Sequence, residues 1–398
     1  MNNWKTMISA IIDDLDSFSD KIRARWRNLK GFDEPLTVIP YLGFGTNEKL
    51  WLRGRVLEKK RDVIASQTDG RRRNLANLYR RFATEEVAGA RVRAVYKNIE
   101  QEAVTDDEGY FFLELSASGV ALDESAFQEI ELEVLDPVVR RDDDLDEGGT
   151  ARAVGQVLVP AATAAFGVIS DLDDTVVTTN VTNRLRMLLT VALRNEYTRM
   201  PFQGVAAFYE ALRKGAGGNE NNPIFYVSSS PWNLYPFLTE FLRLHNIPRG
   251  PLFLKDFGNH TIFNSGDHGE HKLSNIKMIL DTYPQLAFVL IGDSGEQDPE
   301  IYREIVHQYP NRIRAVYIRS IDTRAARLAA IDRLIAEIAE TGCQLVLAPD
   351  TEFAAVHAAA EKLIATEELS KIREEKEIES ISQEAVAAAR LNEVNGGA

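Results

Sequence analysis

Apolar and polar residues follow three different patterns along this chain, and each pattern predicts a different structure. In residues 1–32, large apolar side chains recur every three to four positions between Trp4 and Trp26, which predicts an amphipathic helix. Residues 33–160 contain short segments of alternating character, typical of paired strands. In residues 161–350, short apolar runs alternate with longer amphipathic segments, the pattern of an α/β domain with a parallel sheet.

The second segment is predicted to form a smaller β-sandwich-like domain. Its clearest local signal is the turn Thr105–Gly109, where acidic residues and a glycine precede the apolar residues from Tyr110 onward. A helix is expected near residues 72–82. The predicted strands are Leu36–Leu42, Leu50–Leu57, Arg91–Tyr96, Tyr110–Leu115, Glu129–Leu135 and Gln156–Val159.

The third segment supplies the larger, α/β domain. Its predicted strands are Ala165–Ile169, Ile224–Ser228, Pro251–Leu254, Ala287–Ile291, Arg314–Ile318 and Gln344–Leu347. Its helices are expected near Gly204–Arg213, Trp232–His245, Lys272–Asp281, Pro299–Gln308 and Thr323–Glu340. Residues 351–398 alternate alanine with charge and are predicted to form a C-terminal helical segment with a frayed end.

Composition narrows the class of protein. The 398 residues are 44% apolar and 27% charged, as in ordinary globular proteins, and the net charge of -14 argues against broad nucleic-acid binding. The single cysteine excludes an intramolecular disulfide and a thiolate zinc site. Acidic residues interrupt the first apolar stretch at Asp13, so it does not read as a signal peptide. We expect a cytoplasmic protein; the first helix either packs on the protein itself or lies on a membrane surface as a peripheral contact.

Candidate chemistry begins where the first strand of the α/β domain ends. Asp171, Asp173 and Asp174 place three carboxylates within four residues, followed by Thr175. The carboxyl edge of a parallel sheet is where open α/β folds bind ligands, and clustered carboxylates suit a hard cation such as Mg²⁺. An acidic turn without function is the alternative for this motif taken alone.

Three further features are predicted to reach the same edge. Ser228 closes a second apolar strand and, with Ser229, precedes a helix, which suits phosphate binding. Lys272 near the start of a helix opposes the helix dipole and can instead neutralise a phosphate. Asp293 follows a third buried strand, with Asp298 five residues later. Four such features in order make coincidence a poor explanation.

The residue types suit phosphoryl transfer. Asp171 can attack phosphorus to form an aspartyl-phosphate, and Asp173 can protonate the leaving oxygen and then activate water. Mg²⁺ would be held by Asp171 and Asp293, with a backbone carbonyl at Asp173. Asp298 would orient the metal's waters or Lys272. Thr175, Ser228, Ser229 and Lys272 form the candidate phosphate-binding set.

These motifs resemble the haloacid dehalogenase superfamily of phosphatases, whose four motifs match Asp171–Thr175, Ser228, Lys272 and Gly292–Asp298 in order. Longer strings make the chain similar to the actin-patch-associated phosphatidate phosphatase family, related to the lipins. They run through Gly167–Val176, Tyr226–Pro236 and Gly292–Glu300, and Tyr41–Gly45 with Leu50–Val56 extends the similarity into the β-rich domain. The resemblance implies a Rossmann-like parallel sheet of the haloacid dehalogenase type.

The predicted function is therefore Mg²⁺-dependent hydrolysis of phosphatidate, or a similar lipid phosphate, through an aspartyl-phosphate. A phosphatase of soluble phosphomonoesters keeps the same chemistry, and a non-catalytic phospholipid-binding module is the third alternative. Residues 178–204 are too short for a large cap domain and include an apolar stretch, Leu185–Leu193, which suits either a lipid substrate or core packing. His268 and His271 could indicate a second metal, but a polar loop near the site is the simpler interpretation.

Overall fold

The computed structural model describes residues 36–58, 86–123, 125–136, 150–172, 203–255 and 268–380. The chain divides into two compact units. The β-rich unit comprises Met1–Pro160, Pro231–Phe237 and Lys255–Gly266, and the α/β unit comprises Ala161–Ser230, Leu238–Leu254 and Asp267–Ala398. The helices predicted in residues 1–32 and near 72–82 lie outside the described residues.

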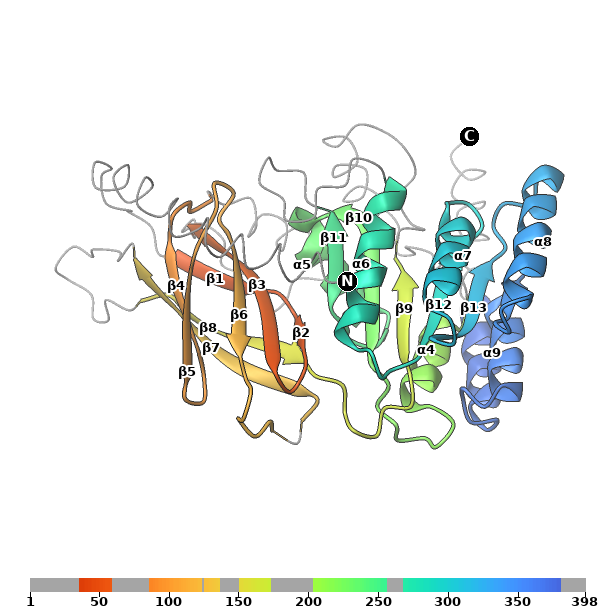
Figure 1. The fold of residues 1–398 in the computed structure, drawn as a ribbon, viewed down its shortest axis with the longest axis horizontal. Helices are drawn as coiled ribbons and strands as arrows, with labels where there is room; N and C mark the ends of the chain where they lie inside the picture. Colours follow the sequence, from red (N-terminus) through yellow and green to blue (C-terminus); the bar gives the residue numbers. More distant parts are fainter. Residues whose placement is uncertain are drawn as a thin grey trace, which may run out of the picture. The chain divides into compact units, whose positions relative to one another are not determined.

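The β-rich unit contains eight strands in one hydrogen-bonded sheet. They are β1 (Leu36–Pro40), β2 (Gly43–Gly45), β3 (Lys49–Glu58), β4 (Arg91–Tyr96), β5 (Ile99–Val104), β6 (Tyr110–Ser116), β7 (Phe127–Asp136) and β8 (Arg152–Leu158). The sheet order is β1-β3-β2-β8-β7-β4-β5, and β6 pairs with β3 (Figure 1). The pairs are antiparallel apart from β2 with β8.

Alternation along the strands builds the core of this unit. In β7, Ile130, Leu132 and Val134 are buried while the glutamates between them face outward to varying degrees. The predicted turn before β6 is present: Asp106 accepts hydrogen bonds from the Glu108 and Tyr110 amides, at 3.0 and 2.8 Å. The described strands are hydrogen-bonded into one sheet, in which β2 pairs with both β3 and β8. Buried residues of β3, β4, β6 and β7 share one core cluster, and the sandwich-like arrangement stays a prediction.

The α/β unit contains a six-stranded sheet in the order β11-β10-β9-β12-β13-β14. The strands are β9 (Gly167–Asp171), β10 (Ile224–Pro231), β11 (Leu252–Lys255), β12 (Phe288–Asp293), β13 (Ile313–Arg319) and β14 (Leu345–Ala348). The helices are α4 (Val205–Lys214), the 3₁₀ turn η1 (Trp232–Leu234), α5 (Tyr235–Leu244), α6 (His268–Thr282), α7 (Asp298–Gln308), α8 (Ala325–Ala339) and α9 (Thr351–Ala360), and residues 368–380 are also helical.

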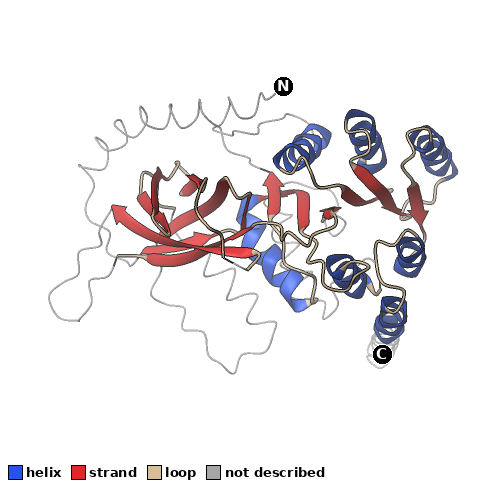
Figure 2. Ribbon diagram, turned by 60° about the horizontal axis from the view of Figure 1, so that its bottom comes forward, coloured by secondary structure: helices blue, strands red, loops and turns tan. Residues whose placement is uncertain are grey.

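The topology places a crevice beside β9. Strand β9 pairs in parallel with β10 on one side and with β12 on the other, so the strand order reverses there. Its apolar residues are fully buried, as expected for a central strand covered on both faces, and Figure 2 shows helices on both sides of this sheet. The predicted α/β domain with a parallel sheet is thus confirmed, and open sheets of this kind bind ligands at such a reversal.

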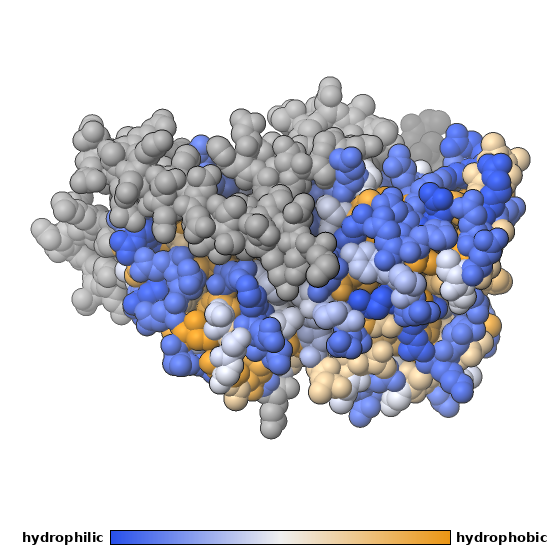
Figure 3. All heavy atoms as spheres, viewed as in Figure 1, coloured by the Kyte–Doolittle hydropathy of each residue, from blue (hydrophilic) through white to orange (hydrophobic). Residues whose placement is uncertain are grey.

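Within the described residues, no helix is both long and apolar enough to cross a membrane. The face shown in Figure 3 is largely hydrophilic where it is coloured, with apolar patches between polar ones. This agrees with the acidic composition and with the burial of most large apolar side chains in the two cores.

Candidate active site

Three neighbouring strands of the α/β unit deliver polar residues to one edge of the sheet. Asp171 ends β9, Ser228 lies near the end of β10, and Asp293 ends β12. The register pairs Asp171 with Val227 and Ser170 with Ile291. Ser228 and Asp293 therefore lie one or two residues beyond positions that pair directly with the end of β9. Parallel strands place their carboxyl ends together, which is why residues far apart in sequence meet here.

Lys272 connects the carboxylates of this edge. Its Nζ lies 2.8 Å from Asp171 Oδ1, 3.1 Å from Asp298 Oδ1 and 2.6 Å from Glu296 Oε2. The Lys272 side chain is 5% exposed and those of Asp171 and Asp298 are 3% and 0% exposed, so both ion pairs are shielded from water. A lysine on the first turns of α6 is therefore explained by the acids it faces, because burying these charges without a partner would be very costly.

The loop after β12 has a compact geometry that requires glycine. Asp298 begins α7 and folds back so that its Oδ2 accepts the Asp293 amide at 3.0 Å. A Cβ at Gly292 would lie 2.4 Å from that same oxygen, so a side chain there is excluded. Asp293 Oδ1 in turn accepts the amides of Gly295 and Glu296, at 2.6 and 3.1 Å. The five-residue spacing of the two aspartates thus has a structural cause.

The donor set at this edge fits a hard divalent cation. Asp171, Glu296 and Asp298 can each offer one oxygen, and these oxygens lie within 4.8 Å of one another. Among the described residues, the buried Oδ2 of Asp293 has no hydrogen-bond donor, although the residue is only 3% exposed. An all-oxygen carboxylate set with one unsatisfied buried oxygen is what Mg²⁺ binding calls for.

The pKa shifts show that burial disfavours the charged form of two acids at this edge. Burial raises the pKa of Asp298 to about 6, with Asp293 adding to the rise and Lys272 opposing it. Burial likewise raises the pKa of Asp293, while the amides of Gly295 and Glu296 oppose the rise. A bound cation would favour the ionised form of both groups and remove this cost.

The candidate phosphate-binding residues are partly described. Ser228 is 1% exposed, and its Oγ accepts the Ser230 amide at 3.0 Å, which turns the chain at the end of β10. Ser229 lies between them in the same turn. Asp173 and Thr175 lie outside the described residues, as does the apolar stretch Leu185–Leu193, so their predicted roles stay predictions.

Sequence reasoning missed two charged residues of this edge. Glu296 lies in the same loop as Asp293 and contacts Lys272, and a third acid in that loop was a visible signal. Arg319 ends β13 opposite Asp293 in the register. Burial lowers the pKa of Arg319 to about 10, opposed by the negative charge of Asp171. The signal would have been a basic residue at the end of a predicted strand beside the acidic one.

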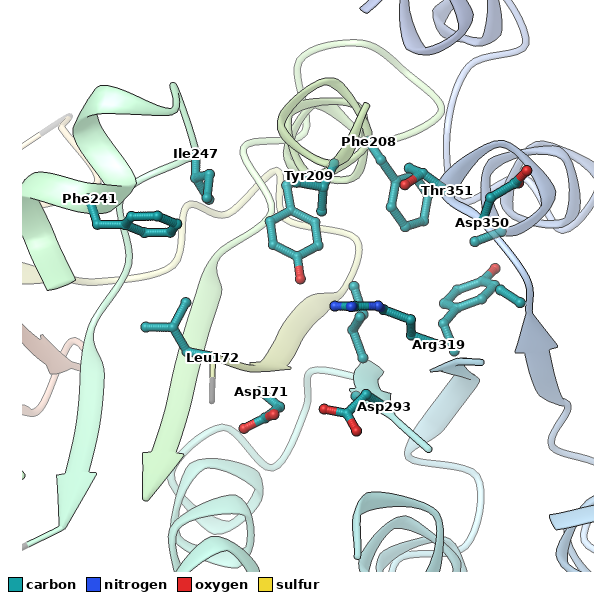
Figure 4. Close-up of a pocket in the computed structure, with 16 residues that line it drawn as sticks. Asp171, Leu172, Phe208, Tyr209, Phe241, Ile247, Asp293, Arg319, Asp350 and Thr351 are labelled. Carbon is teal, nitrogen blue, oxygen red and sulfur yellow. The ribbon is translucent and has the colours of Figure 1, made fainter. Parts of the chain in front are cut away.

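A mainly apolar pocket adjoins Asp171 and Asp293 in the α/β unit. Figure 4 shows the two carboxylates at its lower side and the Arg319 side chain reaching into it. Tyr209 lines the pocket, and its hydroxyl lies 2.6 Å from Ser170 Oγ, next to Asp171 in the chain. Burial raises the pKa of Tyr209 to about 12, so its hydroxyl stays neutral. The other described lining residues are Leu172, Val205, Phe208, Phe241, Ile247, Ile291, Gly292, Tyr317, Ala348, Asp350, Thr351 and Ala354.

His271 belongs to a helix and not to the polar loop that the sequence suggested. It is 2% exposed in α6, and Asn275 Nδ2 lies 3.1 Å from its Nε2. His271 is not in the group of potential metal ligands found among the described residues. A second metal at these two histidines is not tested by the described residues.

Part of the α/β unit is similar to a known catalytic domain. Residues 166–320 match the family described as "Phosphatidate phosphatase APP1, catalytic domain". Phosphatidate phosphatase APP1 of Saccharomyces cerevisiae is 36% identical over 157 residues, which cover 39% of this chain and 26% of that protein. An uncharacterized protein of Schizosaccharomyces pombe is 27% identical over 256 residues, covering 63% of this chain and 40% of that protein.

The chain thus matches only about a quarter and two fifths of the length of these two relatives. Among solved structures, the PilB minor pilin from Streptococcus sanguinis aligns with a TM-score of 0.25 at 10% identity, covering 69% of this chain and 87% of the pilin. A score this low carries no argument about fold or function.

Proposed function

We propose that this chain hydrolyses phosphatidate or a similar lipid phosphate, because residues 166–320 match the family model of the phosphatidate phosphatase APP1 catalytic domain. The observation that carries the proposal is the buried Lys272, held between Asp171 and Asp298 at the carboxyl edge of the sheet. This arrangement supplies a carboxylate nucleophile, a fixed cation and further acids within one site. The order of the motifs is the reason to propose that this unit is of the haloacid dehalogenase type.

The proposed reaction has two steps. A carboxylate oxygen of Asp171 attacks phosphorus, the bond from phosphorus to the ester oxygen breaks, and its electron pair leaves with the lipid alcohol. Asp173 gives that oxygen a proton. Asp173 then takes a proton from water as the water attacks phosphorus, and the bond from phosphorus to Asp171 breaks to release inorganic phosphate. Diacylglycerol and phosphate are the products when the substrate is phosphatidate.

The remaining residues would bind the phosphoryl oxygens and the metal ion. Lys272 and the turn at Ser228 and Ser229 would bind the phosphoryl oxygens, with Thr175 contributing a hydroxyl. Asp171, Asp293 and Asp298 would hold Mg²⁺, together with a carbonyl at Asp173, and Glu296 is close enough to join them. Bound Mg²⁺ supplies charge neutralisation between the nucleophilic carboxylate and the phosphate dianion. Oxygens of Asp171, Glu296 and Asp298 lie within 4.8 Å of one another, and the Asp171, Asp293 and Asp298 side chains are buried, which supports a cation here.

A soluble phosphomonoester is the second candidate substrate. The carboxylates and Lys272 would serve both substrates equally, because they address only the phosphate. The mainly apolar pocket beside Asp171 favours a substrate that carries apolar groups. A binding module without catalysis is less favoured, since binding alone requires no carboxylate nucleophile.

Phosphate release tests the proposal directly. The full chain is assayed on phosphatidate in mixed micelles and on p-nitrophenyl phosphate, with Mg²⁺ or with a chelator. We expect Mg²⁺-dependent turnover of the lipid that falls at least about 10³-fold in Asp171→Asn, because the amide cannot act as the nucleophile.

Glu114→Gln, in the β-rich unit, is the matched acid-to-amide control and should retain activity. Turnover confined to p-nitrophenyl phosphate would replace the lipid with a soluble substrate. Binding of phosphatidate vesicles with no turnover of any ester would instead establish the binding module. Full activity in Asp171→Asn would remove the aspartyl-phosphate mechanism.

A further inference from the structure

Two of the segments that carried the family resemblance in the sequence meet inside one compact unit. Residues Pro231–Phe237 belong to the β-rich unit, although Ser230 before them and Leu238 after them belong to the α/β unit. The segment Tyr41–Gly45 belongs to the β-rich unit as well. The chain therefore leaves the α/β unit immediately after the turn Ser228–Ser230, called the serine turn below, and returns to it after seven residues.

Aromatic stacking holds the segment Pro231–Phe237 against the strands of the β-rich unit. The ring of Tyr41 stacks on Trp232 with centroids 5.3 Å apart and on Tyr235 with centroids 4.0 Å apart. The guanidinium carbon of Arg53 lies 4.4 Å from the Trp232 ring centroid and 4.8 Å from that of Tyr110. Stacked pairs and cation–π contacts each contribute about 0.5–1.5 kcal/mol, so several together hold a short segment firmly.

Hydrogen bonds set the register of the same cluster. The Leu42 amide donates to the Tyr235 hydroxyl at 2.5 Å, and the Tyr41 amide donates to the Arg53 carbonyl at 2.8 Å. Tyr41 and Tyr235 are only 3% and 7% exposed. Burial raises the pKa of Tyr41 well above its usual value, so the ring stays neutral. The cluster is thus a packed, hydrogen-bonded part of the β-rich unit.

The serine turn is joined covalently to this cluster. Ser228 Oγ accepts the Ser230 amide, and only Pro231 separates Ser230 from Trp232. The fixed φ of proline makes this connection stiff, so the position of Trp232 restricts the conformations open to Ser229 and Ser230. Binding sites lose function when such geometry drifts by about 1 Å.

We propose that Trp232 and Tyr235 are positioning residues: the β-rich unit holds them and thereby sets the conformation of the phosphate-binding turn Ser228–Ser230. This inference rests on the proposed role of that turn. It gives the β-rich unit a part in binding phosphate, through the conformation of this turn.

The experiment measures how inorganic phosphate inhibits turnover of p-nitrophenyl phosphate by the full chain. Trp232→Leu removes the stack, Trp232→Phe keeps a ring for Tyr41, and Tyr235→Phe removes only the hydroxyl that accepts the Leu42 amide. Tyr96→Phe is the matched control, because it deletes a buried tyrosine hydroxyl of the β-rich unit that bonds Gln128 at 2.7 Å.

We expect the inhibition constant of phosphate and the KM to rise together, about tenfold in Trp232→Leu and a few-fold in Tyr235→Phe, with kcat changing less. Trp232→Phe should restore most of the affinity, and Tyr96→Phe should not alter it. A purely structural role would lower the melting temperature and the active fraction while leaving the inhibition constant unchanged, and that result would overturn the proposal.

Two further outcomes are also decisive. If Trp232→Leu does not fold, Tyr235→Phe compared with Tyr96→Phe decides, and equal inhibition constants in those two variants reject the inference. If the wild-type chain turns over no ester, calorimetric binding of phosphate replaces inhibition as the measurement. Failure of the proposed function is then distinguished from failure of the positioning role, because only the latter leaves wild-type activity intact.

Discussion

Asp298 is a described residue at which burial and negative charge conflict. Its side chain is fully buried beside Asp293 and Lys272, and its pKa rises to about 6. An unfolded chain would protonate this group only near its usual pKa of about 3.9. Between those values the folded state holds one more proton than the unfolded state, so acidification stabilises the protein as far as this group is concerned.

We therefore expect that, in chelator, lowering the pH from 7.5 to 5.5 stabilises the wild-type chain by about 1 kcal/mol more than it stabilises Asp298→Asn, which cannot titrate. Thermal unfolding of both proteins at the two pH values measures this difference. Added Mg²⁺ should reverse the trend, because the cation competes with the proton for the same carboxylate. Equal pH responses of the two proteins would show that Asp298 is ionised throughout.

The site residues that could be predicted from the sequence are those that directly follow a buried strand. The edge where Asp171, Ser228 and Asp293 meet could be predicted because strand ends are readable from short apolar runs. Glu296 and Arg319 were missed because their roles depend on how a loop folds back and on which strand lies next to β12. Gly292 belongs to the same class: only the structure shows that Asp298 occupies the space of its Cβ.

At the scale of elements, helix α8 holds the acidic loop in place. The Arg327 guanidinium donates to the Ser294 carbonyl at 2.8 Å and to the Glu296 carbonyl at 2.5 Å, and it pairs with Glu300. These contacts connect α8 to the loop that carries the candidate metal ligands. Residues that orient ligands without binding the ion commonly change metal affinity by 10–100-fold.

Arg327→Gln should accordingly weaken Mg²⁺ binding by about tenfold, with only a small loss of stability. Calorimetric titration of Mg²⁺ into the metal-free chain measures the affinity, and a melting curve measures the stability. Arg324→Gln is the control, since Arg324 lies three residues earlier and pairs with Asp322. The positioning role of Arg327 is rejected if both variants bind Mg²⁺ like the wild type.

Two strands, β2 and β5, were not predicted from the sequence, and the cause is physical in each case. Strand β2 is three residues long and contains two glycines, so it carries no alternating pattern. Strand β5 contains exposed glutamate and glutamine residues, because it is the last strand of the sheet order and has little apolar surface to bury. The strands of the α/β unit were recovered because each is a continuous apolar run, the pattern that a sheet covered on both faces imposes.

At the scale of the whole molecule, the chain crosses between its two units several times. Pro231–Phe237 and Lys255–Gly266 belong to the β-rich unit although residues on both sides of each belong to the α/β unit. Sequence reasoning placed one boundary near residue 160 and could not detect these exchanges, because a seven-residue segment inside a strand–helix connection has no compositional mark. Membership in a unit is set by packing, here by Trp232 and Tyr235 against Tyr41.

A chain of residues 161–398 should therefore be less stable than the same residues in the full chain. Trp232 and Tyr235 would lose the ring of Tyr41, the cation of Arg53 and the Leu42 amide, which removes several contacts of about 1 kcal/mol each. A loss of about 2–4 kcal/mol should lower the melting temperature by roughly 4–16 °C for a unit of this size.

Fluorescence gives a direct reading of that loss, because Trp232 is the only tryptophan between residues 161 and 398. In the shortened chain its emission should move to longer wavelength as the ring loses its stacking partners and contacts water. Tyr41→Ala in a full chain whose other three tryptophans are phenylalanine should produce part of the same shift. Unchanged melting and unchanged emission would mean that residues 231–237 fold with the α/β unit alone. The β-rich unit would then have no part in forming the phosphate-binding turn.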